Sequence, residues 1–67
     1  MEKIKFFREK AGMSQRELAV AVGISQAAVA QWEIGTAQPA LDNLRKVAGI
    51  FGVTVDELLK PEAGQND

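Results

Sequence analysis

Two glutamines and two alanines form the pattern in this 67-residue sequence that is best suited to a chemical role. Their spacing brings side chains to one face of an α-helix, and they are Gln26, Ala27, Ala30 and Gln31. In the major groove of DNA, a glutamine amide can make two hydrogen bonds to adenine, and an alanine methyl can contact the methyl group of thymine. The same residues also have good helix propensity, so an ordinary solvated helix face is the alternative interpretation.

Other polar residues lie near the expected helix starts, where free backbone amides attract phosphate groups. Neutral side chains that donate hydrogen bonds commonly supply such contacts to the DNA backbone. The predicted phosphate-contacting residues are Gln15, Arg16, Ser25, Thr36, Gln38 and Asn43. Each has a simpler alternative as a surface residue or, for Ser25, as a helix cap.

The residue types present do not indicate catalysis or metal binding. The chain contains no histidine, cysteine or tyrosine. Ser14 and Ser25 have no nearby base and are explained as helix caps. The carboxylates of Glu17, Glu33 and Asp42 are too scattered to form an evident metal cluster. We therefore expect a protein that is not an enzyme and that binds neither a metal nor a cofactor.

Length and charge narrow the class of protein further. A chain of 67 residues can form one domain, whose marginal core relies on helix packing or dimerisation. No apolar stretch approaches the roughly 20 residues that span a bilayer, and residues 1–5 lack the layout of a signal peptide. The formal net charge is −1, yet residues 1–16 contain five basic residues against Glu2 and Glu9, a local balance of +3. We expect a soluble, cytoplasmic protein that binds no membrane.

Glycines and capping residues divide the chain into five short helices. Four glycines follow helix-length segments, where a left-handed C-terminal cap favours this residue: Gly12, Gly23, Gly35 and Gly52. Ser14 and Thr54 begin capping boxes, and Pro39 suits a first helical position. The expected helices span about 2–11, 14–22, 25–34, 39–51 and 54–60. No segment alternates with period two, so we expect no strand, and residues 61–67 are expected to be a disordered tail beyond a domain of residues 1–60.

Helical periodicity also predicts which residues face the core. The expected inward residues are Ile4, Phe7, Ala11, Leu18, Ala19, Val22, Ala28, Val29, Trp32, Leu41, Leu44, Val47, Ala48, Phe51, Leu58 and Leu59, whereas Phe6 and Ile50 fall outside these faces. The turn from Gly23 to Ser25 is very short, and the small Ala19 beside it lets two helices cross closely. These features predict an all-α, compact five-helix bundle in which the second and third helices form a helix-turn-helix.

One ion pair is expected between the first and third helices. Arg8 and Glu33 each lie at the edge of an apolar face, and a planar guanidinium can meet a carboxylate with two parallel hydrogen bonds. Such a pair would hold the third helix in register. The alternative is that the two residues are independent surface charges.

A homodimer is expected, because one recognition helix reads too few base pairs to define a genomic site. The candidate contact residues are Ile50, Val55 and Leu59, with core packing of the same residues as the alternative. The second function considered is a protein-interaction module or an antitoxin-type partner, in which the same fold binds a toxin or another regulator.

Several motifs together resemble the helix-turn-helix domains of the lambdoid phage repressor and Cro class, also called xenobiotic-response-element family regulators. The resemblance rests on Ser-Gln-Arg-Glu-Leu-Ala at 14–19, Val-Gly-Ile-Ser-Gln at 22–26 and Gln-Trp-Glu-Ile-Gly at 31–35, and it covers roughly residues 3–60. It implies a lambda repressor-like fold and a homodimeric transcription regulator, acting as a repressor on a palindromic operator in double-stranded DNA. The positions that it implies for base contact are Gln26, Ala27, Ala30 and Gln31. It also implies phosphate contacts at Gln15 and Asn43 and an ion pair between Arg8 and Glu33.

Overall fold

The structure, a computed structural model, describes residues 2–60 as five consecutive α-helices. They are α1 (Glu2–Lys10), α2 (Gln15–Val22), α3 (Gln26–Ile34), α4 (Leu41–Phe51) and α5 (Val55–Leu59). The all-α, five-helix prediction is confirmed, and residues 2–60 contain no strand. The predicted tail at 61–67 lies outside the described residues.

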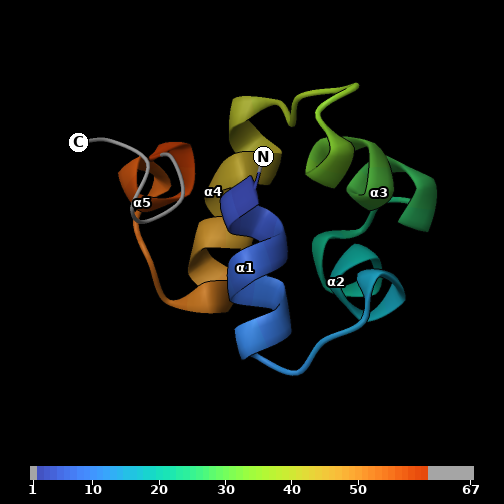
Figure 1. The fold of residues 1–67 in the computed structure, drawn as a ribbon, viewed down its shortest axis with the longest axis horizontal. Coiled ribbons are helices and arrows are strands. Elements are labelled where there is room, and N and C mark those ends of the chain that lie inside the picture. The colour runs from blue at the N-terminus through green and yellow to red at the C-terminus, as the bar shows by residue number, and fades with distance from the viewer. Residues whose placement is uncertain (1, 61–67) are drawn as a thin grey trace.

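Helices α1 and α4 form a central pair, and the other three helices lie on either side of it. Figure 1 shows α1 in front of α4 at the centre, with α2 and α3 on one side and α5 on the other. Helix α1 contacts α3, α4 and α5, and α2 packs against both α3 and α4. Within the described part of the chain, no helix is long and apolar enough to cross a membrane.

The sharp turn between α2 and α3 is fixed by caps on both sides. Gly23 ends α2 in the left-handed conformation, with φ of 89°, and its N–H donates to the Ala19 carbonyl at 2.8 Å. Ser25 begins α3, and its hydroxyl accepts from the Ala28 N–H at 3.1 Å. Ala19 is only 2% exposed, so its small side chain lies where the two helices meet. The predicted helix-turn-helix is therefore present.

The start of α2 is fixed by a complete capping box. The Ser14 hydroxyl accepts from the Glu17 N–H at 3.0 Å, and the Glu17 carboxylate accepts from the Ser14 N–H at 2.7 Å. An N-cap of this kind stabilises a protein by about 1 kcal/mol. Its consequence here is that the first residue of α2, Gln15, has a defined position.

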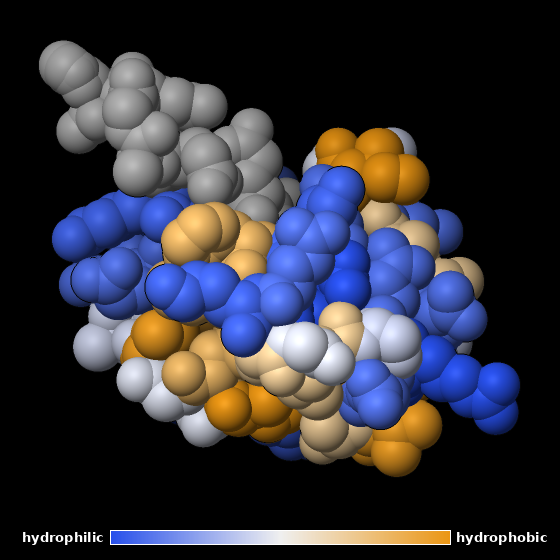
Figure 2. All heavy atoms as spheres, turned by 60° about the horizontal axis from the view of Figure 1, so that its bottom comes forward, coloured by the Kyte–Doolittle hydropathy of each residue, from blue (hydrophilic) through white to orange (hydrophobic). Residues whose placement is uncertain are grey.

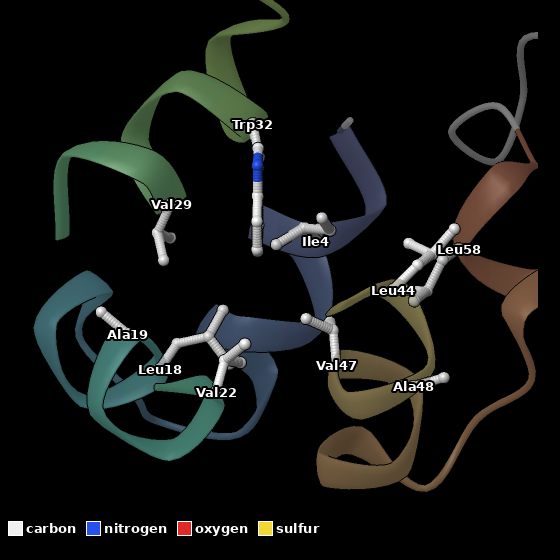
Figure 3. Packing of buried hydrophobic residues seen from close by; sticks show 10 residues of the cluster. All are labelled: Ile4, Leu18, Ala19, Val22, Val29, Trp32, Leu44, Val47, Ala48 and Leu58. Atoms are coloured by element: carbon white, nitrogen blue, oxygen red, sulfur yellow. The ribbon is translucent and has the colours of Figure 1, made fainter. Parts of the chain in front are cut away.

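The core lies where α1, α2, α3 and α4 meet, and α5 closes one side. Figure 3 shows Val29 and Trp32 pointing from α3 toward α1 and α2, while Leu58 of α5 meets Leu44 of α4. The buried apolar residues are Ile4, Leu18, Ala19, Val22, Val29, Trp32, Leu44, Val47, Ala48 and Leu58. One face of α3 therefore packs in the core, and the opposite face points outward from the domain.

Three residues at or next to helix ends were predicted to face the core but are exposed. Ala11 is exposed because α1 ends at Lys10, so the following residue leaves the helical stripe. Leu41 is 54% exposed and Leu59 is 58% exposed, since they are the first residue of α4 and the last residue of α5. At these positions the periodic pattern continues, but no neighbouring helix extends far enough to cover the side chain.

The predicted start of α4 is also wrong. Pro39 does not occupy the first helical position, because α4 begins at Leu41 and its N-cap is Ala40. Ala40 has no side chain that can accept a capping hydrogen bond. Residues 36–40 instead form an irregular connection from α3 to α4, which Figure 1 shows passing above α3.

Candidate nucleic-acid interface

The outward face of α3 carries small and uncharged side chains. Gln26, Ala27 and Gln31 are exposed, and Ala30 is half-buried. The one charged residue of α3, Glu33, is turned away from this face, with a side chain that is only 4% exposed. The face therefore offers amide hydrogen-bonding groups and methyl groups without a charge, which suits contact with base edges.

The predicted phosphate-contacting residues fall into two groups. Gln15, Arg16 and Ser25 lie at the adjoining starts of α2 and α3, where Ser25 is the N-cap of α3. Thr36 and Gln38 are exposed in the connection after α3, and the Thr36 hydroxyl lies 3.5 Å from the Gln31 carbonyl oxygen.

The sixth predicted phosphate contact, Asn43, is half-buried in the first turn of α4. The connection that leads into this turn begins at the end of α3 (Figure 1). The candidate groups therefore flank α3 at both of its ends. Their role as phosphate contacts stays a prediction.

Arg8 and Glu33 form an ion pair with two hydrogen bonds between α1 and α3. Arg8 Nε donates to Glu33 Oε2 at 2.6 Å, and Nη2 donates to Glu33 Oε1 at 3.1 Å. Arg8 Nη1 also donates to the Met13 carbonyl at 2.7 Å. The two side chains are 10% and 4% exposed. One guanidinium thus connects α1, the segment before α2, and α3.

Gln15 extends this ion pair into a chain of hydrogen bonds that reaches the outer face of α3. Gln15 Nε2 donates to Glu33 Oε1 at 3.0 Å, and Gln26 Nε2 donates to Gln15 Oε1 at 3.4 Å. The contact between Gln15 and Glu33 was not predicted from the sequence. The sequence offered one indication of this contact: a Glu33 carboxylate that accepts hydrogen bonds from Arg8 still has lone pairs with which to accept from another donor.

The charges of the ion pair reinforce each other. Burial raises the pKa of the Glu33 carboxyl, but the hydrogen bonds from Arg8 and Gln15 outweigh burial and hold that pKa below its ordinary value. The hydrogen bond with Glu33 in turn raises the pKa of the Arg8 guanidinium. Both groups are therefore charged at neutral pH.

No group of three or more His, Cys, Asp or Glu residues in positions 2–60 could hold a metal ion.

The sequence matches the helix-turn-helix family over residues 4–58. It is 39% identical over 66 residues to the SPbeta prophage-derived uncharacterized HTH-type transcriptional regulator YonR of Bacillus subtilis, covering 98% of this chain and 61% of that protein. It is 34% identical to the HTH-type transcriptional activator BcrR of Enterococcus faecalis, covering 91% of this chain and 30% of that protein. The chain thus spans less than two thirds of the length of these two relatives.

A solved structure shares the fold of this chain. The solution structure of the DNA-binding domain of the P22 C2 repressor superposes with a TM-score of 0.84 and is 32% identical in sequence. The match covers 98% of this chain and 87% of that domain. The lambda repressor-like arrangement expected from the sequence is therefore confirmed.

The lowered pKa of Glu33 predicts how acid affects stability. A carboxyl whose pKa is lower in the folded state stabilises the fold above its unfolded pKa, about 4.3, and this contribution is lost as pH falls through the folded pKa. We expect urea unfolding between pH 7 and pH 3 to show a smaller acid-induced loss of stability for Glu33→Gln than for the unmodified protein. At pH 7 the substitution is expected to cost about 2 kcal/mol, less than a fully buried pair because some solvent reaches Arg8.

Asp42→Asn provides the control, since Asp42 is also acidic but lies exposed on α4. This substitution should leave the acid dependence close to that of the unmodified protein. Equal acid dependence for Glu33→Gln and Asp42→Asn would contradict a stabilising role of the ion pair.

Proposed function

Because the chain belongs to the helix-turn-helix family of Cro/C1 type, whose members are DNA-binding transcription regulators and not enzymes, we propose that it is a repressor that binds a palindromic operator as a homodimer. The observation that carries the proposal is the uncharged outer face of α3, whose glutamines and alanines suit base contacts. The repressor role in this proposal is supported by the likeness to the P22 C2 repressor domain, which extends over 98% of this chain.

In the proposed complex, α3 lies in the major groove and Gln26 reads a base from its first turn. Gln26 donates one N–H to Gln15, whose own amide is oriented by donating to Glu33. The Gln26 carbonyl oxygen and its second N–H stay available for a base. An adenine presents the matching N6 donor and N7 acceptor, so adenine is the base that we propose for Gln26.

The DNA backbone would be held mainly by neutral groups. The second amide hydrogen of Gln15 and the free N–H groups at the starts of α2 and α3 can donate to phosphate oxygens. The further proposed phosphate contacts are Arg16, Ser25, Thr36, Gln38 and Asn43. Because most of these groups carry no charge, the formal net charge of −1 does not conflict with DNA binding.

Dimerisation is proposed through the apolar residues that the core leaves exposed near the C-terminal end of the described chain. Leu59 of α5 is 58% exposed, Ile50 is 37% exposed, and Val55 is half-buried. Ile50 also lines a groove of about 320 Å³ with Phe7, Lys10, Ala11, Phe51 and Val53. Figure 2 turns the lower end of the molecule toward the viewer and shows apolar side chains interrupted by hydrophilic ones.

The position of Lys10 supports a dimer contact through Leu59 rather than one centred on the groove. A two-fold contact centred on the groove would bring the Lys10 ammonium groups of two copies toward each other, which is unfavourable. Leu59 lies on α5 and is outside this groove. We therefore propose a contact centred on α5, with Leu59 as the principal residue. Val55 and Ile50, which also lines the groove, are the further proposed contact residues.

Base reading is tested by selecting the protein against randomised duplex DNA at about 50 and about 150 mM salt, because phosphate contacts weaken with salt. We expect a palindrome to be enriched, and Gln26→Ala or Gln31→Ala to weaken binding to it by about 5- to 100-fold. Val20→Ala is the control, since Val20 is 75% exposed on α2 and outside the proposed interface. Enrichment of no sequence at either salt would contradict operator binding and favour the protein-interaction alternative.

The dimer is tested by analytical ultracentrifugation with and without the selected operator. Leu59→Glu is expected to abolish dimer formation, whereas Leu41→Glu, which places the same charge on another exposed leucine, is expected to leave it intact. The operator half-sites should lie about one helical turn, roughly 10 base pairs, apart. A protein that stays monomeric both free and bound to its operator would overturn the dimer proposal.

A further inference from the structure

We infer that Ile34 reads the methyl group of a thymine and thereby extends the contact surface of α3 beyond the glutamines. This inference rests on the proposed binding of α3 in the major groove. It adds a specificity-determining residue and a stated chemical preference, a 5-methyl pyrimidine, at one position of each operator half-site.

The helical position of Ile34 places it on the outward face. Ile34 lies seven residues after Ala27, so at 3.6 residues per turn the two side chains point within about 20° of the same direction. It also follows Gln31 by three residues, which is neighbouring spacing on a helix surface. The line of outward residues on α3 therefore ends in an isoleucine.

The exposure of Ile34 shows that the fold of this chain does not use it for packing. Ile34 is 75% exposed, while Val29 and Trp32 of the same helix are 0% and 4% exposed. Gly35 follows at once with φ of 98°, so the chain leaves the helix direction directly after Ile34. A large apolar side chain in this place gains free energy when another apolar group covers it.

The proposed occupant is a thymine methyl because this is the apolar group that base edges present in the major groove. The small side chains of Ala27 and Ala30 permit close approach of the helix to the groove floor. Ile34 lies about 10 Å along the helix axis from Ala27, which corresponds to about three base-pair steps if α3 follows the groove. The methyl contact is therefore expected about three steps from the base pair beside Ala27.

The position of Ile34 next to Gln31 on the helix surface favours DNA over a protein partner as the occupant. The next outward residue, Gln31, belongs to the proposed base-reading surface, and Ile34 continues that surface without a gap. Thr36, the nearest polar residue after the helix, has its hydroxyl 3.5 Å from the Gln31 carbonyl oxygen. A thymine methyl contact at Ile34 thus requires only the docking that Gln31 already requires.

The experiment replaces each thymine of the selected operator in turn by deoxyuridine, which removes only the methyl group. Affinities of the unmodified protein and of Ile34→Ala are then measured by fluorescence anisotropy. We expect deoxyuridine at one thymine of each half-site, a symmetry-related pair in the palindrome, to weaken binding of the unmodified protein by about fivefold per replaced thymine and to have no effect on Ile34→Ala. Every other thymine should behave alike in both proteins, and circular dichroism should show that Ile34→Ala remains folded because Ile34 is exposed.

Two results would overturn the inference while leaving the proposed function intact. In one, Ile34→Ala binds the operator as tightly as the unmodified protein. In the other, it binds more weakly, but no deoxyuridine position distinguishes the two proteins, so that the contact is with the sugar-phosphate backbone. Failure of the proposed function gives a different result, since no operator would then be enriched, and this result would overturn both.

Discussion

The orientation of α3 depends on the ion pair between Arg8 and Glu33. Apolar burial of Val29 and Trp32 holds the helix against the core, but the hydrophobic effect is not directional and permits small rotations. Two hydrogen bonds of 2.6 and 3.1 Å between a planar guanidinium and a carboxylate are directional and resist such rotations. Because the outer face lies opposite the core, a rotation of α3 would move every residue of that face relative to a bound surface.

The same carboxylate connects the interior of the domain to its outer face. Glu33 accepts from Gln15, and Gln15 accepts from Gln26. The start of α2 is held by the capping box at Ser14, so the Gln15 side chain extends from a fixed backbone. Side chains that are ordered before binding lose less conformational entropy in a complex. An interface with few basic residues can therefore obtain affinity from preorganised neutral donors.

Much of the fold could be predicted from the sequence because its determinants are local. Glycines follow the ends of α1 to α4, and hydroxyl caps mark the starts of α2, α3 and α5. The edge positions of Arg8 and Glu33 suggest their pairing. Burial at helix ends could not be predicted, since Leu41 and Leu59 follow the apolar pattern but have no covering neighbour. The hydrogen bonds within the site could not be predicted either. The 3.0 Å hydrogen bond from Gln15 to the Glu33 carboxylate, for example, depends on side-chain conformations in two helices.

The proposed DNA interface is tested most directly by NMR titration of the 15N-labelled protein with its selected operator. If α3 lies in the major groove, the side-chain amide resonances of Gln26 and Gln31 and the backbone amides at the starts of α2 and α3 will change most. Resonances of the groove lined by Phe7 and Phe51 will then change little. Large changes in that groove, with the α3 glutamine amides unaffected, would contradict the proposed interface.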